Sequence, residues 1–297
     1  MKTQPAWLNK ELFPFESKWA MIDGHSMHYI DEGPDDQQVP SVETILFVHG
    51  TPEWSFGFRD LVKGLKKDFR CVAIDHLGFG LSDKKEGVDY SVEAHSKRLT
   101  LLIEKLSLKN ITIIANDFGG GISMGYAVQH PGNVRAVVLF NTWMWSLKND
   151  PHFSKPARMI DSWFGRFLYK TMNAPVNMIM PSAFGDKKKL TPEAHRHYKN
   201  VVPDATSRVA LYAIALQLMG ASDWWQQQWD KLSVIENKPI MIFWGMKDKF
   251  VPPTILKKWR DRLPKARVVE YEDAGHFVQE EKADEMTREI SAFLRQY

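Results

Sequence analysis

The sequence has a single cysteine, Cys71, among its 297 residues. One cysteine excludes an internal disulfide and a thiolate-rich metal site, so we expect Cys71 to be a small residue of the core. No apolar run approaches the length of a membrane-spanning helix. Charges at Lys2, Lys10 and Glu11 interrupt residues 1–15, which therefore lack the continuous apolar segment of a signal peptide. These absences predict a reducing, cytoplasmic compartment.

An excess of charge of one sign is also missing. The chain has 39 lysines and arginines against 36 acidic residues, a formal net charge of +3 that is spread along the sequence. This balance gives no electrostatic reason to expect a nucleic acid partner, and the run Lys187–Lys189 is interpreted as a solvated face. No spacing of histidine and glutamate suggests zinc, so we expect no metal. An apolar share of 44% is typical of a globular protein with a substantial core.

Short apolar segments rich in β-branched residues recur along the chain, and each is typical of a buried strand. Segments of helical period lie between several of them, most clearly at 92–106. Alternating strands and helices predict a mostly parallel sheet covered by helices on both faces. An earlier segment, Met27–Ile30, is expected to be an antiparallel strand. The six buried strands are predicted at 44–48, 70–74, 111–115, 134–140, 240–244 and 268–271.

The alternation is interrupted between about Trp143 and Trp229, where the sequence is rich in Trp, Met and Phe within helical patterns. This stretch predicts an inserted helical domain. Ligands of open parallel sheets bind outside the carboxyl ends of the strands, so an insertion at that edge would cover the site as a lid. We therefore expect a core domain of residues 1–142 and 231–297 and a helical cap of residues 143–230.

The segment Ile111–Gly121 has the form of a nucleophile elbow, a sharp turn from a strand into a helix that exposes one side chain at the end of the sheet. The turn is crowded and requires small neighbours, which Ala115 and Gly119 supply. Asp117 stands where many such elbows have serine. Taken alone, an aspartate before glycines after a strand is more often a turn or helix-capping residue.

Two further residues follow predicted strands in the order that the elbow requires. Asp248 follows the strand that ends at Trp244, and His276 follows the last strand. Singly, these two could be a turn residue and an exposed loop histidine. The shared order of nucleophile, acid and histidine instead predicts a catalytic triad of Asp117, Asp248 and His276 at one edge of the sheet.

The loop His49–Pro52 follows the first predicted parallel strand, where this arrangement supplies one backbone N–H of an oxyanion hole. We expect the backbone amides of Thr51 and Phe118 to form that hole. The glycine-rich turn at residues 75–82 is interpreted as structural. The remaining histidines considered, which have no comparable placement, are expected at the surface: His25, His28, His195 and His197.

An aspartate nucleophile favours a different reaction from that of a serine nucleophile. A carboxylate is already ionised near neutral pH and attacks carbon directly, whereas serine must first lose a proton. Asp117 is thus expected to displace a leaving group from an sp³ carbon and form an alkyl ester. His276, oriented by Asp248, would then deprotonate the water that hydrolyses this ester.

With these residues and motifs, the sequence resembles the haloalkane dehalogenase family of α/β-hydrolases over nearly its whole length. The resemblance implies an α/β-hydrolase fold and hydrolysis of small apolar haloalkanes to an alcohol, a halide and a proton, without a metal or organic cofactor. It leaves the oligomeric state open. The segments that carry the resemblance are His28–Gly33, His49–Ser55, Asp75–Asp83, Asn141–Trp145 and Trp244–Asp248.

Two positions depart from the family pattern. The family usually has Trp directly after the nucleophile, with its indole N–H toward the departing halide, and this chain has Phe118. Thr51 stands where Asn is often the second donor. Loss of such donors costs on the order of two or three powers of ten in rate. Other contacts to the leaving group or substrate are expected from Trp143, Trp145, Trp163 and Trp54.

Three alternatives stay open. Epoxide hydrolases use the same triad with two lid tyrosines, for which Tyr169, Tyr198 and Tyr212 are available, although Thr51 departs from the aromatic residue common in their loop. β-Lactone decarboxylases of olefin biosynthesis are close relatives of the dehalogenases, and their long alkyl substrates would suit an apolar lid. A ligand receptor on a hydrolase scaffold is the alternative without catalysis. The apolar lid residues expected for a long alkyl chain are Met178, Met180, Phe184 and Leu218.

Overall fold

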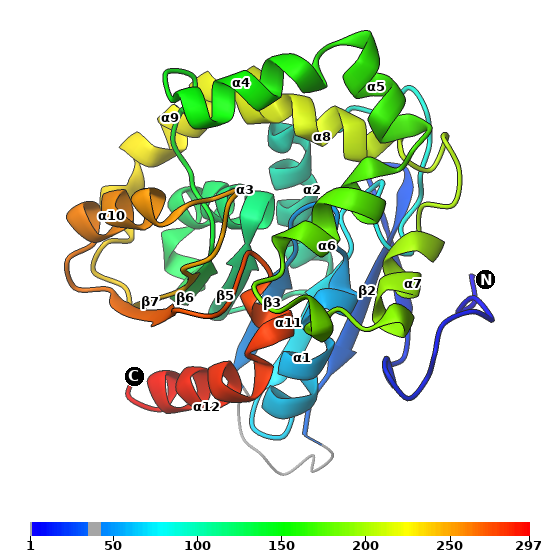
Figure 1. Cartoon of the computed structure of the whole chain (residues 1–297). Coiled ribbons are helices and arrows are strands. Elements are labelled where there is room, and N and C mark those ends of the chain that lie inside the picture. Colours follow the sequence, from blue (N-terminus) through cyan, green and yellow to red (C-terminus); the bar gives the residue numbers. More distant parts are fainter. Residues whose placement is uncertain (1, 35–42) are drawn as a thin grey trace.

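The computed structural model describes residues 2–34 and 43–297, and within them a twisted eight-stranded sheet forms the centre of the molecule (Figure 1). The strand order is β1-β2-β4-β3-β5-β6-β7-β8. Strands β1 and β2 are antiparallel to their neighbours, and β3 to β8 are parallel, which confirms the predicted mostly parallel sheet. The strands are β1 (Lys18–Ile22), β2 (His25–Glu32), β3 (Thr44–Val48), β4 (Arg70–Ile74), β5 (Ile111–Asn116), β6 (Val134–Phe140), β7 (Ile240–Gly245) and β8 (Arg267–Tyr271).

The central strands are apolar because the sheet is covered on both faces. Every residue of β3, β5 and β7 is buried, as expected for parallel strands between two helical layers. The antiparallel strand expected at 27–30 is longer and belongs to a hairpin with β1. Asp23 and Gly24 form its two-residue turn with φ angles of 52° and 74°, the conformation for which an Asp-Gly pair is the usual signal.

Helices of the core pack on the two faces of the sheet. Helix α1 contacts α11 and α12, and α2 contacts α3. The helix predicted at 92–106 is confirmed as α2, whose first turn is capped by the Ser91 hydroxyl, which accepts the Ala94 N–H at 3.2 Å. The core helices are η1 (Ser55–Phe58), α1 (Arg59–Leu65), α2 (Val92–Lys105), α3 (Asp117–Gln129), η2 (Pro131–Asn133), α10 (Pro253–Arg262), α11 (Val278–Glu281) and α12 (Ala283–Leu294).

An inserted helical cap follows β6 and precedes β7, as predicted, and residues 141–239 contain no strand. Figure 1 shows α4, α5 and α8 across the top of the molecule, above the sheet. The limits of 143 and 230 stay our prediction for the cap domain. Its helices are α4 (Pro151–Ile160), α5 (Trp163–Lys170), the π-helical turn η3 (Pro175–Ile179), α6 (Met180–Ala183), η4 (Lys187–Lys189), α7 (Pro192–Asn200), α8 (Val209–Gly220) and α9 (Ser222–Asp230), followed by the short η5 (Leu232–Val234).

Two of the histidines expected at the surface are buried. The His28 Nδ1–H donates to Asp75 Oδ2 at 2.7 Å, and His197 stacks on Phe56 with ring centroids 4.6 Å apart. Their partners are distant in sequence, so local patterns did not predict them. Asp75 also accepts the Ser55 N–H at 2.8 Å and the Leu81 N–H at 2.7 Å. These bonds give the glycine-rich turn the structural role that was expected of it.

Cys71 is buried in β4, as predicted, and burial raises the pKa of its thiol. Among the described residues, none of the helices combines the length and the apolar character that crossing a membrane requires.

Candidate active site

The turn from β5 into α3 places Asp117 in a strained conformation. Its φ is 49°, a left-handed value that aspartate tolerates better than most residues with a side chain. The Thr142 hydroxyl donates to the Asp117 carbonyl at 2.6 Å and holds the turn. A Cβ on Gly119 would lie 2.3 Å from the Val48 carbonyl oxygen, and one on Gly50 would lie 2.3 Å from Asp117 Oδ1. Close backbone approach therefore explains why small residues flank this aspartate.

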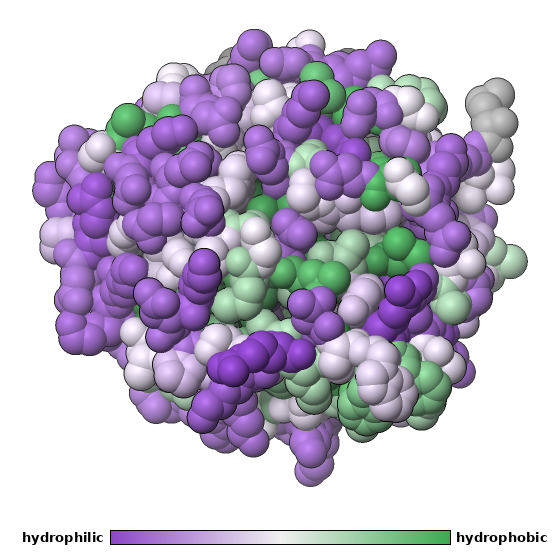
Figure 2. All heavy atoms as spheres, turned by 90° about the horizontal axis from the view of Figure 1, so that it is seen from above, coloured by the Kyte–Doolittle hydropathy of each residue, from purple (hydrophilic) through white to green (hydrophobic). Residues whose placement is uncertain are grey.

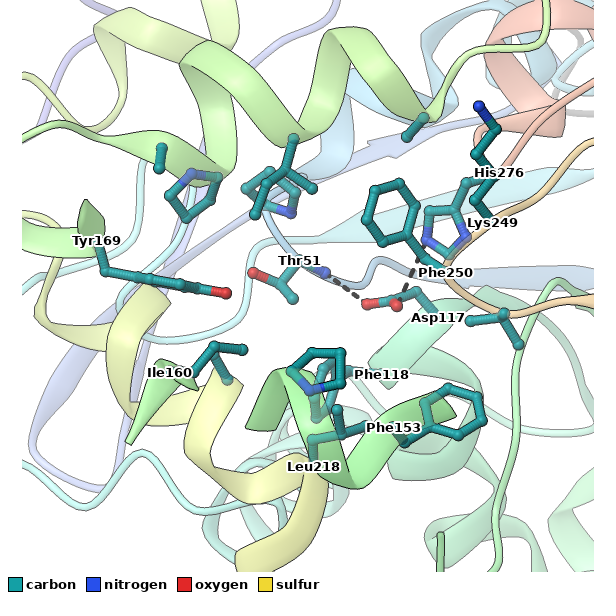
Figure 3. A pocket seen from close by; sticks show the side chains of 18 of the residues that line it. Thr51, Asp117, Phe118, Phe153, Ile160, Tyr169, Leu218, Lys249, Phe250 and His276 are labelled. Carbon is teal, nitrogen blue, oxygen red and sulfur yellow. Dashed lines mark hydrogen bonds and ion pairs between the residues drawn. The ribbon is translucent and has the colours of Figure 1, made fainter. Parts of the chain in front are cut away.

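The structure brings Asp117, His276 and Asp248 together in one buried cluster at the carboxyl edge of the sheet. The His276 Nδ1–H donates to Asp248 Oδ2 at 2.6 Å, and His276 Nε2 lies 3.4 Å from Asp117 Oδ2. The three side chains are nearly inaccessible to solvent. Each comes from a segment that follows a strand, so the predicted residues meet in the predicted order. Figure 3 shows the His276 ring directed at the Asp117 carboxylate.

Backbone and side-chain donors fix Asp248. Its Oδ1 accepts the N–H groups of Phe250 at 2.7 Å and Val251 at 3.0 Å, and its Oδ2 accepts from the Asn141 side chain at 2.8 Å. The Asn141 amide also accepts the Gly245 N–H at 2.9 Å. The sequence analysis named Asn141 only as the first residue of a segment that carries the family resemblance. Its location directly after a predicted strand, like those of the three predicted triad residues, was the signal that the sequence offered for a place at this edge.

Two carboxylates set the ionisation of His276. Burial by itself would lower the pKa of His276, but Asp248 and Asp117 outweigh it and raise that pKa well above its ordinary value. The imidazole is thus held as a cation while both carboxylates are charged. Any event that neutralises Asp117 removes one of these charges and lowers the pKa of His276, which frees the ring to accept a proton.

The two oxygens of Asp117 have different neighbours. Oδ1 accepts the backbone N–H of Thr51 at 2.8 Å, whereas Oδ2 faces His276. Phe118 follows in the first turn of α3, where backbone N–H groups have no partner within the helix. The two amides predicted to form an oxyanion hole therefore come from the loop and the turn that flank Asp117.

A cavity of about 450 Å³ lies over Asp117 and is lined mainly by apolar side chains (Figure 3). Tyr169 of α5 faces Asp117 from the cap, and Figure 3 shows its hydroxyl pointing toward Thr51. Burial, with a smaller contribution from Asp117, raises the pKa of Tyr169, so its hydroxyl stays protonated. His152 and Lys249 are lining residues that are also exposed, which places them at the mouth.

Of the four tryptophans predicted to contact a substrate, only Trp143 lines the cavity. Its ring lies 5.0 Å from that of Phe118, and its indole nitrogen is buried without a hydrogen-bond partner among the described residues. Trp145 is buried against Trp229 and Trp259 instead. Trp54 stacks on Phe56, and Trp163 of α5 is 81% exposed. Sequence position did not predict which face of each element carries the ring.

Of the other cap residues proposed from the sequence, some line the cavity and others do not. Met178 and Leu218 line the cavity, whereas Met180 and Phe184 do not. Among the three tyrosines, Tyr169 is the one in the lining; the Tyr198 hydroxyl bonds to Glu280, and Tyr212 packs beside Tyr169 with ring centroids 5.8 Å apart.

Helix α4 supplies lining residues that sequence reasoning missed. They recur at the helical spacing of three and four residues, which was the signal that could have found them. The loop after Asp248 adds Lys249 and Phe250. The lining residues of α4 are His152, Phe153, Pro156, Met159 and Ile160.

Known proteins resemble this chain over most of its length. Residues 43–283 match the model of the alpha/beta hydrolase fold family. The chain is 33% identical to haloalkane dehalogenase 2 of Mycobacterium tuberculosis over 283 residues, which are 94% of this chain and 95% of that protein. It is 30% identical to the cis-3-alkyl-4-alkyloxetan-2-one decarboxylase of Shewanella oneidensis over 297 aligned residues, covering 95% of this chain and 89% of that one.

Solved structures give the same fold. The haloalkane dehalogenase DatA from Agrobacterium tumefaciens superposes with a TM-score of 0.83 at 22% identity, covering 95% of this chain and 96% of that one. The family model and the mycobacterial relative both extend across most of the sequence. The chain therefore belongs to the α/β-hydrolase fold family, as a haloalkane dehalogenase-like enzyme.

Proposed function

We propose that this enzyme hydrolyses small apolar haloalkanes to an alcohol and a halide, through an alkyl ester on Asp117. The observation that carries the proposal is that the two carboxylate oxygens of Asp117 have different surroundings. Oδ1 is engaged by the Thr51 N–H at 2.8 Å, and Oδ2, 3.4 Å from His276, lies at the floor of an apolar cavity. Apolar surroundings reduce the solvation of the carboxylate, which strengthens it as a nucleophile.

In the first step, Asp117 Oδ2 attacks the carbon that carries the halogen. A carbon–oxygen bond forms, the carbon–halogen bond breaks, and the halide leaves with its electron pair. The ester is neutral, so the Asp117 charge that helped to raise the pKa of His276 is gone. His276 then releases its proton to solvent, which is the proton that the overall reaction produces, and becomes a base.

In the second step, His276 Nε2 removes a proton from a water molecule, which attacks the ester carbon Cγ of Asp117. The oxyanion forms on Oδ1, the oxygen that already accepts the Thr51 N–H. Collapse breaks the bond between Cγ and the alkylated oxygen, and the leaving alkoxide takes a proton from the imidazolium to become the alcohol. The hydroxyl that water added then returns its proton to His276, which regenerates the Asp117 carboxylate and the protonated ring. Asp248 stabilises the imidazolium through its bond to Nδ1.

The halide requires a donor, because Phe118 has none. We assign this role to Trp143, whose ring lies in the cavity wall beside Phe118 and whose indole N–H has no partner within the described part of the chain. Trp54 and Trp244 also have unpartnered indole nitrogens, but they do not line the cavity.

Tyr169 supports a second candidate, the opening of a strained oxygen ring such as a β-lactone or an epoxide. In these substrates the leaving group is an alkoxide or carboxylate oxygen, which an O–H donor stabilises or protonates. The protonated hydroxyl of Tyr169 faces Asp117 across the cavity. The similarity to the alkyloxetanone decarboxylase is consistent with this candidate.

Trapping the ester tests the proposal directly. We expect His276→Phe to undergo the first step with a bromoalkane but not the second, so the peptide that contains Asp117 gains the mass of the alkyl group without bromide. An adduct only with a whole epoxide, or a species derived only from a β-lactone, favours the second candidate. No adduct with any of the three substrates contradicts the nucleophile assignment and favours a ligand receptor.

A matched pair of variants separates the two candidates. Trp143→Phe and Tyr169→Phe each remove one donor and keep an aromatic ring. If the enzyme is a dehalogenase, Trp143→Phe lowers kcat with bromoalkanes by about ten- to a hundredfold, and Tyr169→Phe has little effect. The reverse ranking, measured with a β-lactone or an epoxide, favours the second candidate.

A further inference from the structure

Exposed hydrophobic side chains are concentrated on one part of the cap. Six of the ten large hydrophobic residues that are exposed in the described chain lie between residues 159 and 178, a segment of only twenty positions. Such a concentration marks an interaction surface, since scattered exposed residues would be spread along the chain. We call this set the cap patch; it consists of Met159, Trp163, Phe164, Phe167, Met172 and Met178.

Helix α5 is the centre of the cap patch and is apolar on both sides. Leu168 and Tyr169 face the cavity, which accounts for the inner side. Trp163, Phe164 and Phe167 occupy the outer side at helical spacing, where a globular protein normally has polar residues. Trp163 is 81% exposed and lies 5.8 Å from Phe164 between ring centroids. The aromatic rings thus project from the molecule instead of completing its core.

Basic residues accompany the cap patch. Residues 151–180 contain four lysines and arginines and one acidic residue, a difference of +3. Lys170 pairs with Glu86 at 3.7 Å, whereas Lys155, Arg158 and Arg166 are exposed and have no ion-pair partner within residues 2–34 and 43–297. Figure 2, which looks down on the cap, shows hydrophobic side chains gathered among hydrophilic ones on this face. The combination of exposed aromatics and unpaired cations is typical of proteins that rest on anionic membranes.

The cap patch is continuous with the mouth of the cavity. Met159 and Met178 belong to both: each is about half exposed or more, at 48% and 60%, and each lines the cavity. Phe250, 37% exposed, lies on the same rim. An apolar molecule dissolved in a lipid layer against this face would therefore reach the cavity without crossing water.

We propose that the cap patch docks reversibly on anionic lipid surfaces and directs the mouth of the cavity toward the lipid. Aromatic side chains enter the interfacial region, and Lys155, Arg158 and Arg166 contact the lipid phosphates. A second copy of this chain fits less well. In a symmetric dimer through this face, both copies would bring the same three unpaired cations to one interface, where like charges repel.

Vesicle binding tests the docking surface without using catalysis, so its result is independent of the proposed reaction. The full chain is mixed with vesicles of equal parts phosphatidylcholine and phosphatidylglycerol, and with vesicles of phosphatidylcholine alone, and the sedimenting fraction is measured. We expect binding to the anionic vesicles, weaker binding to the neutral ones, and a blue shift of tryptophan emission from burial of Trp163. Replacing Trp163, Phe164 and Phe167 together by Ser should lower the partition coefficient by at least about tenfold.

Three controls make the outcome decisive. Met21→Ser removes a side chain that is 62% exposed in β1, outside the cap, and should leave vesicle binding unchanged. Circular dichroism establishes that the triple variant is folded, and sedimentation velocity gives the oligomeric state. The proposal is overturned if the parent binds neither vesicle, or if the triple variant binds as well as the parent. It is also overturned if the cap patch holds a dimer that the triple substitution dissociates.

Discussion

The carboxyl edge of the sheet and the cap line the same cavity but hold their side chains in opposite ways. At the sheet edge, polar groups are buried and engaged, as Asp248 is by two backbone N–H groups and Asn141. In the cap, the lining residues are mostly apolar and come from short helices, and several of them are exposed at the mouth. Directional bonds therefore fix Asp248 and the cluster at the sheet edge, while the space beside that cluster is defined mainly by the shape of apolar side chains.

This contrast predicts that the two regions respond differently to substitution. Changes at the sheet edge should affect the rate of chemistry or the ionisation of buried groups. Changes at the apolar lining residues of the cap, as distinct from the proposed donors Trp143 and Tyr169, should alter which substrates fit and leave the chemistry intact.

The largest effect is expected at Asp117. Asp117→Asn keeps the size of the side chain and tolerates the left-handed φ of 49°, but an amide is a poor nucleophile. We predict a loss of turnover of at least about 10⁴-fold, measured as halide release, with an unchanged melting temperature. Substantial turnover by a freshly purified, sequence-verified variant would remove Asp117 from the role of nucleophile.

A smaller effect is expected at Asn141, which positions Asp248 without contacting the reacting atoms. Asn141→Ala removes a hydrogen bond of 2.8 Å to Asp248 Oδ2. We predict that hydrolysis of the ester slows about ten- to a hundredfold while its formation is nearly unaffected, so the alkyl-enzyme accumulates in a burst experiment. Equal slowing of both steps would indicate general distortion of the turn, and Asn141→Ser, which keeps a short donor, serves as the comparison.

The residues of the sheet edge could be predicted because their signals are local. An apolar run followed by small residues marks the end of a strand, and parallel topology brings such ends to one edge. That reasoning sufficed to bring together Asp117, Asp248 and His276. It missed Asn141 because nothing in its local sequence shows that β7, a hundred residues later, lies beside it.

The lining of the cap could not be predicted in the same way. Which face of a short helix meets the cavity depends on packing between distant segments, and α5 is apolar on more than one side, whereas only the single apolar face of α4 could have been found from its spacing. Trp143 and Trp163 have the same residue type and both follow polar residues, yet one is buried in the cavity wall and the other is exposed. The burial of His28 could not be predicted for the same reason, because its partner Asp75 is 47 positions away in the sequence.

A pH-dependent effect on stability is expected from Glu53, a buried residue beside the sheet edge. Its carboxyl oxygens accept from Gln279 at 2.6 Å and from Asn116, which precedes Asp117. Burial raises the pKa of Glu53 from 4.5 to about 8, despite the opposing bond from Asn116. The folded state therefore favours the protonated form, and Glu53 lowers the stability of the fold as pH rises from its unfolded pKa toward 8.

Glu53→Gln should remove this dependence because the amide does not ionise. We predict that parent and variant have similar free energies of unfolding at pH 5, and that the variant is more stable at pH 8 by about 1–3 kcal/mol. Urea denaturation at the two pH values measures the difference. A gap that is the same at both pH values would show that Glu53 does not titrate in this range.

The smallest effect is expected in the cap, at Leu218 of α8. Leu218→Ala enlarges the cavity at a site remote from the bonds that hold the triad. We predict that kcat/KM rises a few-fold for longer bromoalkanes and falls a few-fold for shorter ones, each by less than about tenfold, since a methylene contact is worth about 1 kcal/mol. A uniform loss with all chain lengths would show that the cap also positions the reacting groups.

Isotope transfer tests most directly whether Asp117 itself attacks carbon. A single turnover is run in water enriched in the heavy oxygen isotope, with enzyme in excess over a bromoalkane. If the ester forms and is hydrolysed at Cγ, the alcohol carries unlabelled oxygen from the carboxylate, and the peptide containing Asp117 gains the label. Label in the alcohol and none in that peptide would mean that water attacks the substrate directly, and would contradict an aspartate nucleophile.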